Sequence, residues 1–322
     1  MYNLIKPILF SFDPEDIHKL SFKLIPYIPK KIKNLYKVED QKLNREFFGI
    51  KFPNPVGLAA GLDKDGTVFE HLSDFGFGFV EIGTVTPMKQ KGNEKPRLYR
   101  LVKENALINR MGFNNLGIYN LINNIENRNK DIILGVNIAR NKFTSNKNAY
   151  IDYAYCISKL ENYVDYFTIN ISSPNTPELR ELQKPDDLRN LLLHISDTMT
   201  EKPILLKISP DINNRELEDI VKASEDLVNG YIATNTTVDR DKIKGYKSCI
   251  GGLSGAPLRE KSTAVIYQLN KLTDLPIIGS GGIMSAEDAL EKMDAGADLI
   301  QIYTGFIFKG PQLIKDINKK LI

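Results

Sequence analysis

Short polar segments follow apolar runs at several places in the chain, and their residue types limit the chemistry they could perform. They contain lysines and many amides, but no pair of carboxylates, no histidine and no cluster of metal ligands. Lysines and amides can hold a planar polar ligand, yet they supply no strong general base or Lewis acid. We therefore expect a bound cofactor, and no metal, to perform the chemistry. The segments are Gly61-Leu62-Asp63-Lys64, Gly83-Thr84, Asn137, Asn170, Ser172-Ser173-Pro174-Asn175-Thr176, Lys207, Thr234-Asn235-Thr236, Gly281-Gly282 and Tyr303-Thr304-Gly305.

The glycines among these segments indicate a phosphate site. Gly281-Gly282 and Thr304-Gly305 follow the last two apolar runs, and Gly251-Gly252-Leu253-Ser254-Gly255 precedes them. Barrel enzymes bind phosphate at this place through backbone N–H groups and the N-terminus of a helix. Tight turns, which glycine permits in any barrel, are the alternative explanation.

Eight short apolar runs rich in β-branched residues precede these polar segments. Such near-continuous runs are typical of parallel strands that are buried on both faces. Helical patterns alternate with them, for example at 146–161, 186–200, 213–227, 285–295 and 311–321. Eight β/α units predict a (β/α)8 TIM barrel with the polar segments at the carboxyl ends of the strands, where barrels hold their active sites. The runs are 55–60, 78–85, 132–139, 166–172, 204–209, 230–236, 276–281 and 299–304.

A doubly wound open sheet is the alternative fold. It usually has fewer strands and a G-x-G-x-x-G turn after the first, which this sequence lacks. Two connections, 86–115 and 237–261, are long for a barrel. Long loops on a compact domain are usually lids or binding loops.

The composition excludes several classes of protein. With 42% hydrophobic and 26% charged residues, the chain is an ordinary globular protein, and its net charge of +3 does not predict nucleic-acid binding. Cys156 and Cys249 lie far apart and predict reduced thiols in place of a disulfide or a zinc site. A serine hydrolase is disfavoured because no G-x-S-x-G occurs.

Residues 1–37 form a basic segment ahead of the barrel, which we assign to 38–322. Asp13-Pro14-Glu15 is typical of a helix start, and Ile17, Leu20 and Leu24 fall on one helical face. No run reaches the roughly 18 apolar residues of a spanning helix. Two explanations remain open, which are amphipathic helices on a membrane surface and a helical cap on the domain. Lys30, Lys31 and Lys33 slightly favour the membrane.

The order of the motifs resembles class 2 dihydroorotate dehydrogenases over nearly the whole chain. The resemblance is specific because it rests on many ordered segments. Glu178 departs from it, at a position where the family commonly has glycine, and should alter the loop locally. The segments are NPVGLAAGLDKDG, EIGTVTP, NRMGFNN, LGVNIARNK, NISSPNTPELRELQ, IATNTTVDR, GGLSGAPL, GSGGI and IQIYTGFIFKG.

The resemblance implies FMN as the cofactor and dihydroorotate as the substrate. Lys207 would lie at the pyrimidine edge of the flavin and stabilise its reduced, anionic ring, and Lys64 would pair with the orotate carboxylate. The FMN-binding positions are Ala60, Gly61, Lys64, Thr84, Asn137, Asn170, Lys207, Thr234, Gly255, Gly282, Tyr303 and Thr304. The substrate-binding positions are Lys64, Asn109, Arg110, Met111, Gly112, Phe113, Asn170, Asn175, Asn235 and Thr236.

Ser173 matches the catalytic base of the family, which removes a proton from C5 while a hydride leaves C6 for the flavin. Serine is a poor base unaided, and the residues do not reveal how it is activated. The resemblance implies a short proton relay with Thr176 as its next member. Class 1 enzymes carry cysteine at the base position, so Ser173 together with the N-terminal segment implies class 2.

Class 2 membership implies a membrane quinone as the electron acceptor. The N-terminal helices would rest on the bilayer and form an apolar passage to the flavin. Without an Arg-rich transit peptide, we expect a peripheral protein on the cytoplasmic face of a bacterial inner membrane. The family further implies a monomer. Candidates for the lining of the passage are Leu4, Ile8, Phe12, Ile17, Leu20 and Leu24.

Two other functions remain as alternatives. One is a different FMN barrel, such as an enzyme that reduces uridine in transfer RNA, but the barrel carries about −1 charge once the N-terminal segment is set aside, which disfavours RNA. The other is a non-catalytic barrel that only binds a phosphorylated ligand.

Overall fold

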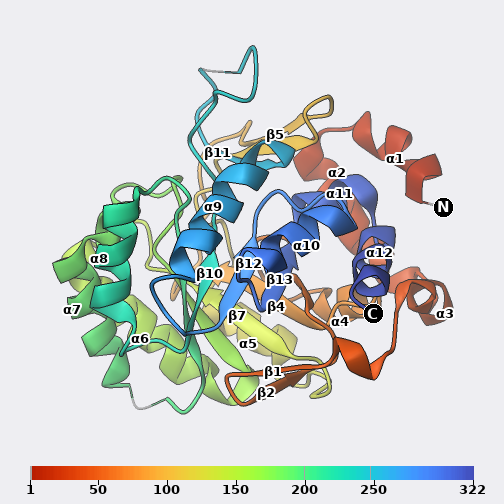
Figure 1. Cartoon of the computed structure of the whole chain (residues 1–322). Helices are drawn as coiled ribbons and strands as arrows, with labels where there is room; N and C mark the ends of the chain where they lie inside the picture. Colours follow the sequence, from red (N-terminus) through yellow and green to blue (C-terminus); the bar gives the residue numbers. More distant parts are fainter. Residues whose placement is uncertain (1, 199, 247) are drawn as a thin grey trace.

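Eight parallel strands close into a barrel at the centre of the molecule (Figure 1). The computed structural model describes residues 2–198, 200–246 and 248–322. All eight predicted strands are present, so the prediction of a TIM barrel is confirmed. Each strand is shorter than its apolar run, mainly because the last polar residues leave the sheet to form the strand-end loops. The strands are β3 (Val56–Leu58), β4 (Phe79–Val85), β7 (Leu134–Ile138), β8 (Tyr166–Asn170), β9 (Ile204–Ile208), β10 (Gly230–Ala233), β12 (Ile277–Ser280) and β13 (Leu299–Ile302).

Helices surround the barrel, and the helical patterns in the sequence locate five of them within a few residues. Asn213 begins α8 with a capping box, since its side chain accepts from the N–H of Glu216 while Glu216 accepts from the N–H of Asn213. Residue 199, within the predicted helix 186–200, lies outside the described residues. The helices are α4 (Phe69–Ser73), α5 (Ile118–Ile125), α6 (Ala149–Leu160), α7 (Pro185–Ser196), α8 (Asn214–Ser224), α9 (Arg259–Leu269), α10 (Ala286–Asp294), α11 (Thr304–Lys309) and α12 (Gln312–Lys320).

The amino-terminal end of the barrel is filled by aromatic side chains. A hairpin of β1 (Arg45–Phe47) and β2 (Ile50–Phe52) lies across this end and inserts Phe52 against Phe79. Gly57 makes room for the ring of Phe79, because a Cβ at Gly57 would lie 2.2 Å from it. This end is therefore closed by packing, and a ligand site is left to the opposite end.

The two long connections pair with each other, which the sequence does not reveal. Strands β5 (Leu98–Leu101) and β6 (Ala106–Asn109) come from the first connection, and β11 (Gly252–Gly255) comes from the second. They form an antiparallel sheet in which β6 is the central strand. Residue 247, in the second connection, is outside the described residues. The sheet holds both connections against the carboxyl end of the barrel.

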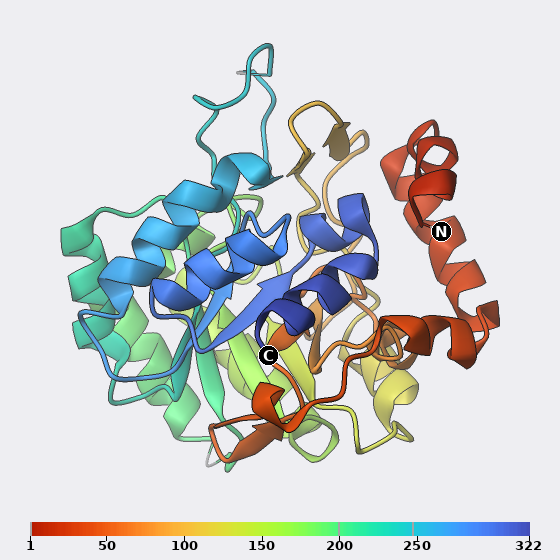
Figure 2. The same cartoon turned by 45° about the vertical axis from the view of Figure 1, so that its right-hand side comes forward.

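The N-terminal segment lies along one side of the barrel (Figure 2). It contains α1 (Tyr2–Phe10), α2 (Pro14–Leu24), α3 (Lys30–Lys33) and short 3-10 turns. Arg100 of β5 donates to the carbonyls of Phe10 and Phe12, and Lys33 is buried beside Asp74. Among the described residues, no helix combines the length and the apolar character needed to cross a bilayer. The division of the chain at residue 37 stays a prediction.

Candidate active site

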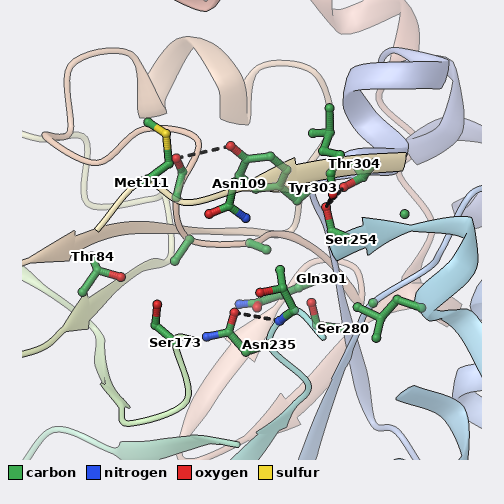
Figure 3. Close-up of a pocket in the computed structure, with 18 of the residues that line it drawn as sticks. Thr84, Asn109, Met111, Ser173, Asn235, Ser254, Ser280, Gln301, Tyr303 and Thr304 are labelled. Atoms are coloured by element: carbon green, nitrogen blue, oxygen red, sulfur yellow. Dashed lines mark hydrogen bonds between the residues drawn. The ribbon is translucent and has the colours of Figure 1, made fainter. Parts of the chain in front are cut away.

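A deep pocket opens at the carboxyl ends of the barrel strands and is roofed by β6 and β11. Its open volume is about 1270 Å³, including solvent at its mouth. In Figure 3, Ser173, Thr84 and Asn235 line one part of the pocket, whereas Ser254 and Thr304 line another. The polar strand ends found in the sequence therefore meet in one site.

The predicted cofactor residues line this pocket, with the exception of Asn137. Gly255 and Gly282 have φ values of 95° and 79°, which side chains rarely tolerate. A Cβ at Gly282 would lie 2.3 Å from Cα of Arg259. Only glycine therefore allows the backbone at position 282 to pack this closely against Arg259. Thr304 donates to Ser254 at 2.8 Å and ties the start of α11 to β11. These residues form a compact concave wall of small side chains.

Two predicted site residues lie off the pocket wall. Asn137 is fully buried behind it, because its Nδ2 donates to Glu81 at 2.9 Å and its Oδ1 accepts from Thr84 at 2.6 Å. The side chain of Arg110 does not line the pocket, although its neighbours Asn109 and Met111 do. The residue follows the last position of β6, and its N–H donates to the carbonyl of Arg97.

The predicted substrate residues other than Arg110 converge from separate elements. Asn175, in the loop after β8, donates to Asn109 of β6 at 3.0 Å. Asn235, after β10, donates to Ser172 Oγ at 3.0 Å. Lys64 donates to the carbonyl of Gly61 at 2.8 Å, and burial lowers its pKa to about 8. At neutral pH the site therefore presents amide groups and a mostly charged ammonium group.

Ser173 faces the pocket and is 6% exposed. Its Oγ accepts the N–H of Asn175 at 3.3 Å. Thr176 is buried and does not line the pocket, and no hydrogen bond joins it to Ser173 among the described residues. The relay through Thr176 therefore stays a prediction.

Lys207 lies in β9 and is also 6% exposed. Burial lowers the pKa of its ammonium, while the carboxylate of Glu81, 3.8 Å from Nζ, opposes that shift. Lys207 is thus held among buried groups and lines the pocket. Its place inside an apolar strand is the feature by which the sequence predicts it as a site residue.

Several residues that line the pocket are not predicted by the sequence. Gln301 of β13 lines the floor and donates to Glu81 at 2.7 Å. It could have been found, because an amide inside an apolar strand is as unusual as Lys207. Glu15 and His18 reach the pocket from α2, where two polar residues on an amphipathic helix give no signal in the sequence.

The apolar residues expected to line a passage in the N-terminal segment lie elsewhere. Leu4, Ile8 and Phe12 are 79%, 63% and 56% exposed, and Leu20 and Leu24 are exposed as well. Ile17 is buried. None of the six lines the pocket, and the residues of α2 that do line it are Glu15 and His18.

Known proteins resemble this chain over nearly its whole length. A family model described as dihydroorotate dehydrogenase matches residues 42–322. The dihydroorotate dehydrogenase (quinone) of Christiangramia forsetii is 50% identical over 99% of this chain and 98% of that protein. The one from Shewanella denitrificans is 46% identical over 98% of each. The solved structure of DHODH from Eimeria tenella with ferulenol has a TM-score of 0.89 at 34% identity and covers 96% of this chain and 90% of its own. The chain therefore belongs to the dihydroorotate dehydrogenase family.

Proposed function

We propose that this chain oxidises (S)-dihydroorotate to orotate in pyrimidine biosynthesis, with FMN as bound cofactor and a membrane quinone as electron acceptor. The observation that carries the proposal is that Ser173, Lys64 and Lys207 face one pocket from different strand ends. The names of the relatives support the same reaction. In this reaction the C5–C6 bond becomes a double bond, and the substrate loses a proton and a hydride.

The pocket suits FMN in its shape and its donor groups. The wall formed by Gly255, Gly282 and Thr304 brings backbone close enough to contact a phosphate. Lys207 and Gln301 on the floor suit the polar pyrimidine edge of a flavin. FMN, when bound, supplies the hydride-accepting group that the side chains lack.

The remaining pocket groups suit a small cyclic imide with one carboxylate. Lys64 would pair with the carboxylate, while Asn109, Asn175 and Asn235 donate to and accept from the ring. Ser173 would take the proton from C5 at its Oγ as its own hydroxyl proton leaves for a neighbouring acceptor, so that the hydroxyl ends neutral. The N–H of Asn175, already directed at that oxygen, would stabilise the negative charge that Oγ carries while its own proton departs.

The N-terminal segment suits attachment to a membrane surface. Its exposed apolar side chains Leu4, Ile8 and Tyr27 stand away from the barrel although the segment is packed against it. Lys30 and Lys31 would meet anionic headgroups. We place the protein, as a monomer, on the cytoplasmic face of a bacterial inner membrane, where an apolar quinone is available.

Orotate production with two acceptors tests this function. The intact protein should reduce a long-chain quinone in vesicles and a water-soluble dye, whereas a variant without residues 1–36 should use only the dye. Leu4→Ser with Ile8→Ser should lose vesicle binding and quinone turnover. The matched control is Ile151→Ser with Leu193→Ser, which removes exposed apolar groups from α6 and α7 on another side of the barrel (Figure 1). The proposal would be contradicted if neither acceptor supported orotate production by the intact protein. It would also be contradicted if the truncated protein used the long-chain quinone as well as the intact protein does.

A further inference from the structure

The carboxylate of Glu81 lies fully buried beneath the pocket. Glu81 is in β4, and groups on four other barrel strands are directed at it. Burying a carboxylate is costly unless hydrogen bonds and a positive charge compensate, so a group in this position needs an explanation. Its neighbours are Asn137 Nδ2 at 2.9 Å, Thr168 Oγ1 at 3.1 Å, Tyr166 OH at 3.4 Å, Gln301 Nε2 at 2.7 Å and Lys207 Nζ at 3.8 Å.

From Glu81, amide side chains form a directed chain to the substrate side of the pocket. Asn137 donates its Nδ2 to Glu81, so its Oδ1 is turned to accept from Asn170 Nδ2 at 2.9 Å. Asn170 has then committed its Nδ2, and its Oδ1 accepts from Asn235 Nδ2 at 3.4 Å and from Ser172 Oγ at 3.2 Å. Each amide therefore presents its nitrogen toward Glu81 and its oxygen toward the pocket.

An ionised carboxylate can only accept hydrogen bonds, whereas an amide can turn either end to a neighbour. Backbone N–H groups also orient two of these amides, because Ser172 N–H donates to Asn170 Oδ1 at 3.3 Å and Thr236 N–H donates to Asn235 Oδ1 at 2.8 Å. With Glu81 at the root of the amide chain, the reversed direction would bring the Asn137 carbonyl against the carboxylate and leave a buried amide group without a partner. The acceptor at the root thus selects the direction of Asn137, and this direction agrees with the one that the backbone favours at Asn170 and Asn235.

We infer that Glu81 is a positioning residue that fixes the direction of Asn137 and, through it, secures Asn170 and Asn235 in the orientation that sets the pattern of donors and acceptors offered to the substrate. The inference rests on the proposed function, because it treats Asn170 and Asn235 as substrate-holding residues. Glu81 also orients Gln301, which lines the pocket and whose Oε1 has no hydrogen-bond partner among the described residues. Glu81 itself is not part of the pocket lining.

Two variants separate this role from simple stability. Glu81→Gln keeps the size of the side chain but can donate, so both directions become available. Thr168→Val removes another hydrogen bond to the same carboxylate and leaves the amide chain intact. In the double variant Glu81→Gln with Asn137→Asp, the carboxylate, which can only accept, moves one step along the chain to position 137. One of its oxygens can accept from the new Gln side chain, and the other still accepts from Asn170.

Orotate affinity, read from the shift of the bound flavin spectrum, is the measurement, with FMN content and thermal unfolding recorded in parallel. Orotate binding to the wild type first tests the proposed function, and the ratio of variant to wild type tests Glu81. Glu81→Gln should weaken orotate binding about ten- to hundredfold, as expected for unpaired buried polar groups. The double variant should recover to within about threefold and Thr168→Val should stay within about twofold.

Three results would overturn the inference. In the first, Glu81→Gln binds orotate no more weakly than Thr168→Val. In the second, the double variant holds FMN but remains at least tenfold weaker. In the third, neither Glu81→Gln nor the double variant retains flavin, which would place Glu81 in flavin binding or folding in place of the orientation of the substrate amides.

Discussion

Glu15 and Arg97 form a two-point ion pair that fastens the N-terminal segment to the rim of the pocket. Arg97 Nη2 lies 2.8 Å from Oε1 and its Nε lies 3.1 Å from Oε2. Both side chains are only 10% exposed. The hydrogen bond from Arg97 is the main cause that lowers the pKa of Glu15. The contact therefore links α2 to the residue that precedes β5.

Glu15→Gln should loosen α2 without affecting the barrel core. A charge-assisted pair of this kind contributes about 2 kcal/mol to local stability. Its loss in the variant should make amide hydrogen exchange in residues 14–24 roughly 30-fold faster. Because the folded-state pKa is depressed, wild-type protection is present above the usual carboxyl pKa and is lost as pH falls through the folded value. Glu39→Gln, at an exposed pair with Lys37, is the matched control and should change little. Equal exchange in both variants would show that the pair does not hold the segment.

His18 should make the protein less stable in mild acid. Burial, assisted by the charge of Lys64, lowers its pKa from 6.5 to about 4. The unfolded chain takes up a proton below about 6.5 while the folded protein does not, so stability is lost between these two values as pH falls. The loss from this group by pH 5 should be about 2 kcal/mol in urea unfolding. His18→Gln, which can still donate to the carbonyl of Leu62, should remove this part of the pH dependence. If the pH dependence of stability were the same in His18→Gln as in the wild type, His18 would not be held neutral in the folded protein.

Arg180 should position the loops that carry the base and the substrate amides. It donates to the carbonyls of Ser172 and Thr236, each at 2.9 Å, and pairs with Asp211 at 2.9 Å. Arg180→Ala should lower kcat about tenfold or more while FMN content stays near normal, because misplacing reacting groups is costly. Arg189→Ala removes a comparable ion pair, with Asp226, far from the pocket and should leave kcat unchanged. Equal kcat in the two variants would remove Arg180 from this role.

Gly282 should be essential for holding the phosphate of FMN. Alanine there would combine an unfavourable φ of 79° with a Cβ 2.3 Å from the Arg259 backbone. We expect Gly282→Ala to be purified with little FMN. Gly49 has a similar φ of 73° but open space around it, so Gly49→Ala should cost about 1 kcal/mol and keep its FMN. A normal FMN content in Gly282→Ala would show that the wall formed by Gly255, Gly282 and Thr304 does not hold the phosphate.

The sequence predicted the barrel and most of the pocket because both depend on local patterns. Lys207 was found because a lysine interrupts an apolar strand, and Gln301 could have been found in the same way. The position of Asn137 behind the pocket wall could not be predicted, since the alternation of side chains along a strand does not say how deep a side chain lies. The β5–β6–β11 sheet joins Asn109 to Gly252, which are far apart in sequence. Pairing at such a distance leaves no local signature.

Glu178 shows how a departure in sequence can be interpreted physically. It stands where the family commonly has glycine, and its φ of 57° is in the left-handed region that favours glycine. Its carbonyl accepts from Asn146 at 2.8 Å, and this hydrogen bond helps to hold the backbone in that conformation. Glu178 lies outside the pocket lining, and its expected local effect on the loop stays a prediction.

The most direct test of the account is the first half-reaction without oxygen. FMN-loaded protein is mixed with dihydroorotate, and the flavin absorbance is followed. We expect rapid bleaching that a quinone reverses, and in Ser173→Ala at least a hundredfold slower bleaching with FMN still bound. A flavin that dihydroorotate does not bleach in the wild type, or one that bleaches at the wild-type rate in Ser173→Ala, would contradict the substrate or the base, respectively.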